Sequence, residues 1–179
     1  MQGSRKSMAE VHIQERGLML VDLHEDHIKP FVDNISPESE REFREFYKIS
    51  LTDALVNVIN DPFAFTVLKD GKPVAITGAA LFADHALIWA VFSNDLRRHW
   101  ISFARASKKL MDFYHGFHEE LRSTVWTENH MAHQWLLHLG FVPADIVYDP
   151  KNKQSSLHFV RCDNDTKYGD GSISRPVLH

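Results

Sequence analysis

Apolar residues recur along this chain with two different spacings, and the spacing changes several times between its ends. Short alternating or continuous apolar runs predict strands, whereas apolar residues three or four positions apart predict helices. The predicted strands cover residues 18–23, 63–68, 73–82, 85–92, 121–126, 141–148 and 156–160. The predicted helices cover residues 25–34, 36–60, 100–114 and 129–139. The order is therefore strand, two helices, three strands, helix, strand, helix and a final pair of strands.

Short sequence signals support the ends of several of these elements. Ser36-Pro37-Glu38 combines a capping serine, a proline at the first helical position and an acid in the first turn, so a helix should begin here and run to about Asn60. Asp70-Gly71 between two apolar runs predicts a hairpin. Asn129 can cap the last helix, and Gly140 lies where that helix needs a left-handed residue to end.

Length and composition indicate one globular domain. The chain has 179 residues, of which 44% are hydrophobic and 25% are charged. These values are ordinary for a single domain with a substantial core. We expect an N-terminal extension at residues 1–17, the folded domain at residues 18–162 and a polar C-terminal tail at residues 163–179.

Charge and cysteine content restrict the cellular locations and the binding partners that we expect for this protein. The net charge of −4 argues against attraction of the whole surface to nucleic acid or anionic lipid. The single cysteine, Cys162, permits no internal disulfide and indicates a reducing compartment. No apolar run is long enough to span a membrane, and the N-terminus lacks the apolar core of a secretory signal. The sequence therefore predicts a cytoplasmic protein that is not secreted and has no membrane partner.

Histidine is frequent, with twelve residues in the chain. His130 and His133 lie three apart on one predicted helix, and His115 and His118 are spaced in the same way. A structural zinc site needs about four ligands, and two histidines on a short helix supply too few. We therefore expect no metal, and we interpret these residues as partly exposed helix histidines.

The segment from Asn129 to Phe141 and the order of the elements together resemble the GNAT superfamily of N-acetyltransferases. Asn129-x-x-Ala132, an apolar helical run and Leu139-Gly140-Phe141 match the region of those enzymes that follows the fifth strand. The resemblance implies a mixed α+β fold, with a central, mostly antiparallel sheet of six to seven strands and about four helices on both faces. It also implies that the fourth and fifth strands splay apart to admit the pantetheine arm of acetyl-CoA.

The loop that binds the cofactor in GNAT enzymes is altered here. In those enzymes a glycine-rich turn opens the long helix, and its backbone N–H groups hold the pyrophosphate of acetyl-CoA. The matching residues 91–102 contain no glycine, and Arg97, His99 and Ile101 stand where glycine is expected. We therefore predict no cofactor, because large side chains would crowd the phosphates. If acetyl-CoA does bind, the resemblance assigns its contacts to Val91, Ser93, Arg97, Arg98, Trp100 and Asn129.

The usual catalytic acid is also absent. Leu136 stands seven residues after Asn129, where many GNAT enzymes carry the tyrosine that protonates the leaving thiolate. Leucine has no proton to donate, so Glu128 and Tyr148 are the remaining candidates for a catalytic role. An acid such as Glu128 at the start of a helix is also explained by its favourable interaction with the helix dipole.

A narrower resemblance is to the internal virion or assembly proteins of short-tailed phages, which keep the GNAT fold but have a degenerate cofactor loop. It rests on Phe92-Ser93-Asn94-Asp95, Val125-Trp126 and Asn129-His130. It implies a phage-encoded protein, located in the cytoplasm of a bacterial host or inside the phage particle. Other phage structural proteins would then be its partners.

Three functions are compatible with these observations. The first is a non-catalytic structural, assembly or binding protein with a GNAT fold and a degenerate acetyl-CoA loop. The second is an active acyl-CoA-dependent N-acyltransferase with an atypical donor site. The third is a nucleic-acid-binding module, which ranks last because the net charge is acidic and a basic helix face is usually a solvated surface. That module would use the basic residues Arg97, Arg98, Arg105, Lys108 and Lys109.

Overall fold

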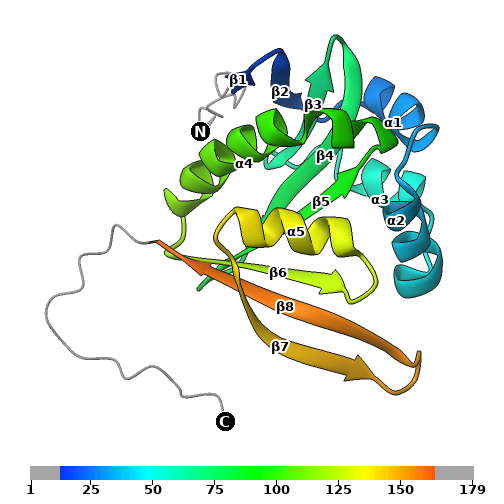
Figure 1. Ribbon diagram of the computed structural model, residues 1–179, viewed down its shortest axis with the longest axis vertical. Helices are drawn as coiled ribbons and strands as arrows, with labels where there is room; N and C mark the ends of the chain where they lie inside the picture. Colours follow the sequence, from blue (N-terminus) through cyan, green and yellow to red (C-terminus); the bar gives the residue numbers. More distant parts are fainter. Residues whose placement is uncertain (1–12, 164–179) are drawn as a thin grey trace, which may run out of the picture.

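The computed structural model describes residues 13–163, which form one sheet of eight strands with helices on both faces (Figure 1). The strand order is β1-β2-β3-β4-β5-β6-β8-β7, and all neighbours are antiparallel except β5 and β6. The strands are β1 Gln14–Glu15, β2 Leu18–Asp22, β3 Ala64–Lys69, β4 Lys72–Leu81, β5 Ala86–Phe92, β6 Glu120–Trp126, β7 Val142–Asp149 and β8 Gln154–Cys162. The predicted α+β fold is confirmed, with eight strands in place of six or seven.

The helices divide between the two faces of the sheet, and each face has its own hydrophobic core. The α-helices are α1 Glu25–Val32, α2 Pro37–Arg41, α3 Leu51–Asn57, α4 Trp100–His115 and α5 His130–His138. Phe103 of α4 and Trp135 of α5 are buried in one core. Phe31 of α1 and Leu55 of α3 are buried in the other. Strand residues reach both cores because successive side chains of a strand point to opposite faces.

The prediction of a single helix from Ser36 to Asn60 is wrong. The helix begins as predicted, since the Ser36 side chain accepts a hydrogen bond from the N–H of Ser39. The chain then passes from α2 into a π-helical turn, Glu42–Tyr47, and Lys48 adopts a left-handed conformation with φ of 55°. Ser50 caps α3 as a separate helix. We call residues 34–48, from the end of α1 through the π-helical turn, the strap.

The fourth and fifth strands of the predicted fold, β5 and β6, splay apart as expected. Their parallel pairing is limited to Ala86 with Leu121 and Leu87 with Arg122. The hydroxyl of Ser123 then donates to the carbonyl of Ile88 at 2.9 Å, and beyond this bond the two strands diverge. The divergence leaves a gap at the carboxyl ends of both strands, and this gap is the starting point for the functional site.

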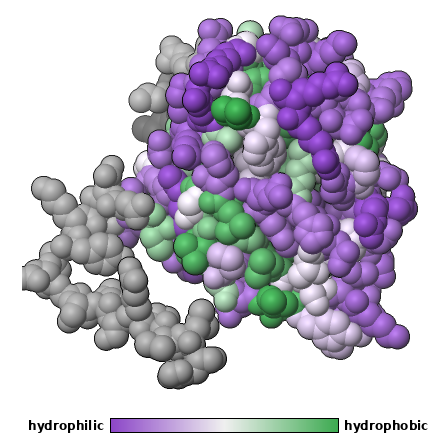
Figure 2. All heavy atoms as spheres, viewed as in Figure 1, coloured by the Kyte–Doolittle hydropathy of each residue, from purple (hydrophilic) through white to green (hydrophobic). Residues whose placement is uncertain are grey.

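One edge of the sheet is unusually exposed. β7 is the last strand, and nearly all of its residues are open to solvent. Val142 and Ile146 are 64% and 70% exposed, and Leu137 of the neighbouring α5 is 53% exposed. Figure 2 shows hydrophobic side chains gathered over this lower part of the face. Among residues 13–163, no helix has the length and apolar character needed to cross a membrane.

Candidate functional site

The gap between β5 and β6 contains a pocket of about 280 Å³. Both strands and the strap supply its walls, and α5 and α3 close its sides. Most of the lining is apolar, and the main polar side chains in it belong to Glu42, Ser123 and Thr124. The large apolar wall residues include Phe43, Tyr47, Trp89, Val91, Val125 and Trp135. A concave apolar pocket with a few polar groups is the usual form of a small-molecule site.

The strap is hydrogen-bonded to the β5 side of this gap. The N–H of Ser36 donates to the carbonyl of Phe92 at 2.9 Å, and the N–H of Phe92 donates to the hydroxyl of Ser39 at 3.3 Å. Two residues further along, the N–H of Asn94 donates to the carbonyl of Asn34 at 2.8 Å. The backbone at the end of β5 therefore already has partners from the protein's own chain.

The strap is also bonded to the β6 side of the gap, through one carboxylate. Glu42 is only 5% exposed and accepts from the backbone N–H of Trp126 at 3.2 Å and from the side-chain amide of Asn129 at 2.6 Å. The other side-chain atom of Asn129, its oxygen, accepts from the N–H of Ala132 and caps α5. Burial raises the pKa of the Glu42 carboxyl, although the two hydrogen bonds lower it in part.

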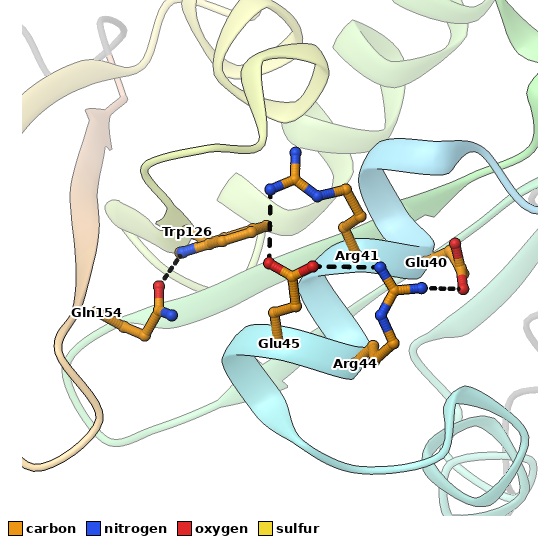
Figure 3. A network of polar contacts seen from close by, with 6 residues as sticks. All are labelled: Glu40, Arg41, Arg44, Glu45, Trp126 and Gln154. Atoms are coloured by element: carbon orange, nitrogen blue, oxygen red, sulfur yellow. Dashed lines mark hydrogen bonds and ion pairs between the residues drawn. The ribbon is translucent and has the colours of Figure 1, made fainter.

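A second set of contacts holds the outer face of the strap against the end of β6 (Figure 3). The guanidinium of Arg41 lies 5.3 Å from the centre of the Trp126 ring, within the range of a cation–π interaction. The indole N–H of Trp126 donates to the side-chain oxygen of Gln154 on β8 at 2.7 Å. Glu45 pairs with both Arg41 and Arg44 on the solvent side. The strap thus bridges the open ends of β5 and β6.

The region that would meet the cofactor phosphates is a short 3-10 helix, Asn94–His99, which joins β5 to α4. Arg97 forms an ion pair with Glu38 of the strap. A guanidinium nitrogen of Arg98 lies 3.9 Å from a carboxylate oxygen of Asp95. Ser93 is fully buried, and its hydroxyl has no hydrogen-bond partner among the described residues. Two of the cationic groups predicted to contact phosphate are therefore close to carboxylates.

The other residues singled out from the sequence fall into two groups. Val91 and Asn129 lie at the gap, Val91 in the pocket wall and Asn129 at its β6 end. Trp100 begins α4 and packs against the core on that face. Glu128 is exposed in the turn before α5, and Tyr148 is 58% exposed on the edge strand β7. The pocket lining includes neither of these two, and a catalytic role for them stays a prediction.

Sequence reasoning missed Glu42, the one carboxylate in the pocket. In the sequence it is one of several acids in the predicted helix from Ser36 to Asn60. Glu38, Glu40 and Glu45 are the other glutamates, and each forms an ion pair with an arginine. The π-helical turn begins at Glu42, and nothing in the local sequence distinguishes this residue from its neighbours.

Two basic residues of the long helix form ion pairs with one acidic residue of β1. Arg105 and Lys109 both pair with Glu15 of β1, at 3.8 and 3.2 Å. Arg97 pairs with Glu38 and Arg98 lies near Asp95, so four of the five basic residues lie close to a carboxylate, with Glu15 shared between two of them. Binding of nucleic acid phosphates depends on uncompensated positive charge, so the described contacts favour the interpretation of a solvated helix face.

Comparison with known proteins identifies the fold. No family model and no curated protein matches this sequence. Among solved structures, a GNAT-family acetyltransferase from Streptococcus agalactiae gives a TM-score of 0.66 at 10% identity, covering 86% of this chain and 99% of that one. The microcin C7 self-immunity acetyltransferase MccE, solved in complex with acetyl-CoA and AMP, gives 0.66 at 10% identity, covering 88% and 99%. The ribosomal-protein-S5-alanine acetyltransferase from Vibrio fischeri gives 0.62 at 13% identity, covering 88% and 100%.

These similarities define the class: the protein has the fold of the GNAT acetyltransferases. At 10 to 13% identity they concern the fold alone. The function of the site therefore depends on the particular residues of this chain.

The buried carboxylate of Glu42 should make stability depend on pH. Because burial raises its pKa above the ordinary value of 4.5, the folded state binds this proton more tightly than the unfolded state does. The free energy of unfolding should therefore fall as the pH rises from about 4.5 through the folded-state pKa, and then level off. Urea titrations of wild type and Glu42→Gln at several pH values isolate this contribution as their difference. A difference that does not change with pH would contradict the burial of an ionisable Glu42.

Proposed function

We propose that this protein is a GNAT-fold binding protein that does not take acetyl-CoA in the manner of the enzymes. The observation that carries the proposal is the strap. It bonds to the backbone at the ends of both β5 and β6, where the enzymes admit the pantetheine arm. The ligand site of the binding protein is the apolar pocket in the same gap.

The phosphate region supports the same proposal. A phosphate contacting Arg97 would have to displace the carboxylate of Glu38, which belongs to the strap. No glycine lies between Val91 and Ser102 to let phosphates approach the backbone. In the described arrangement these residues do not fit the cofactor.

Thermal melting with acetyl-CoA tests the proposal. A ligand that binds only the folded state at 100 times its dissociation constant stabilises a protein by about 2.7 kcal/mol, which moves the melting temperature by several degrees. We expect no shift at millimolar acetyl-CoA, while an acetyltransferase of the same fold, measured in parallel, should shift. A shift that saturates with concentration would contradict the proposal.

An active N-acyltransferase is the second candidate, and one observation favours it. A carboxylate of raised pKa lies in the gap pocket, and such a group suits general-base chemistry on an amine. For this function the strap would have to leave the ends of β5 and β6. Release of free thiol from acetyl-CoA in the presence of a panel of amines would establish this candidate in place of the first.

The role in a phage particle, with other phage structural proteins as partners, remains part of the proposal for the biological setting. It rests on the sequence resemblance at Phe92–Asp95, Val125–Trp126 and Asn129–His130. Co-purification of the protein with intact particles tests it, and absence from purified particles would contradict it.

A further inference from the structure

The carboxylate of Glu42 differs from the other acids of the strap in having no cationic partner in the part of the chain that the structure describes. Glu38 pairs with Arg97, Glu40 with Arg44, and Glu45 with Arg41. Within residues 13–163, the hydrogen bonds to Glu42 come from two uncharged donors, a backbone N–H and an amide. A buried charge is costly unless an opposite charge compensates it. In its ionised form Glu42 is therefore left without a compensating positive charge among the described residues.

The rest of the pocket suits a cation with an apolar surface. Phe43, Tyr47, Trp89 and Trp135 contribute aromatic rings to the lining. The faces of aromatic rings attract cations, and recognition of quaternary ammonium groups by clusters of aromatic residues follows from this. Tyr47 and Ile49 line the pocket and are 42% and 53% exposed. A ligand entering the pocket would therefore meet apolar surface.

The volume limits the size of the ligand. A cavity of about 150 Å³ holds benzene, so a pocket of about 280 Å³ should accommodate roughly twice as many atoms, about eleven heavy atoms. A molecule of this size has room for one ring and one substituted nitrogen. A nucleotide is far larger.

From these three observations we infer that the gap pocket binds a compact apolar organic cation, with its positive nitrogen beside Glu42 and its apolar body among the aromatic walls. The inference rests on the proposed function, since it assumes that the strap stays in place and that the pocket is a ligand site. The ligand is held and not acylated, so a quaternary ammonium, which has no N–H to lose, should bind as well as an amine of similar size.

Benzyltrimethylammonium and its uncharged isostere neopentylbenzene are suitable probes, because they share one shape and differ in charge. Binding is measured through changes in tryptophan fluorescence, since Trp89 and Trp135 line the pocket. We expect the cation to bind wild-type protein at least tenfold more tightly than the isostere. Equal affinities, or no binding of the cation, would overturn the inference.

Two variants locate the charge that is responsible. Glu42→Gln keeps the shape of the side chain and removes its charge. It should lower the affinity for the cation at least tenfold and change the affinity for the isostere less than twofold. Glu40→Gln, on the solvent side of the same strap, should leave both affinities unchanged. Loss of cation affinity in Glu40→Gln, or none in Glu42→Gln, would contradict the inference. If Glu42→Gln does not fold, the comparison of the two probes on wild type still decides.

The cation-binding experiment and the acetyl-CoA experiment can fail independently of each other. Saturable binding of acetyl-CoA would defeat the proposed function whatever the cation does. Absence of both acetyl-CoA and cation binding would leave the closed gap intact and defeat only the inference about the ligand.

Discussion

Replacing Glu42 with alanine should lower the free energy of unfolding by about 3 kcal/mol, because it leaves two buried donors without an acceptor. The N–H of Trp126 and the amide of Asn129 both donate to this carboxylate, and Asn129 is 1% exposed. Each unsatisfied buried donor costs about 1–3 kcal/mol, and relief of the buried negative charge offsets part of the sum. Urea unfolding followed by circular dichroism measures the change.

Glu40→Ala is the matched control for this prediction. Glu40 lies in α2, two residues before Glu42, and pairs with Arg44 on an exposed face. Surface pairs of this kind contribute at most about 1 kcal/mol. If Glu42→Ala proved no more destabilising than Glu40→Ala, the carboxylate would not be the link between the strap and β6.

Gly78→Ala should be comparably destabilising, by about 2–3 kcal/mol, because β4 has no room for a side chain at this position. An added Cβ would overlap the ring of Trp89 on β5 and would lie 2.8 Å from the carbonyl oxygen of Phe63. The backbone oxygen cannot move freely, so the Trp89 ring must shift. Because that ring is part of the pocket wall, the variant should also weaken binding of any ligand in the gap.

Gly71→Ala separates steric overlap from backbone strain. Gly71 has a φ of 77° in the hairpin turn, and nothing lies within 4 Å of an added Cβ. Only the left-handed conformation opposes the substitution, at a cost of about 1 kcal/mol. Chemical denaturation of the two variants side by side gives the comparison. Equal losses of stability would contradict tight packing of Trp89 on Gly78.

Much of the fold could be predicted because its signals are local. The Asp70-Gly71 turn, the cap at Asn129 and the stop at Gly140 each specify a boundary by the chemistry of a few neighbouring residues. The structure places a turn between β3 and β4, and α5 begins and ends as these residues require. The splayed strands came from the resemblance to GNAT enzymes, and the short pairing of β5 with β6 confirms them.

The strap could not be predicted because its conformation depends on distant contacts. From Ser36 to Asn60 the apolar spacing suits one α-helix, whereas in the structure Ser50 caps a separate one. The π-helical turn and the left-handed Lys48 depart from that pattern. The bond from Glu42 to Trp126 joins residues 84 positions apart. Local sequence carries no information about such a pairing, so the closing of the gap became visible only in the structure.

We propose that the strap occupies the strand ends at which a GNAT enzyme would hold its cofactor. A crystal structure of the protein soaked in coenzyme A tests it most directly. We predict no cofactor density between β5 and β6. The hydrogen bonds of Ser36 and Ser39 with Phe92 should remain, and so should the one between Glu42 and Trp126. Clear density for the pantetheine arm in that gap, with the strap displaced, would contradict it.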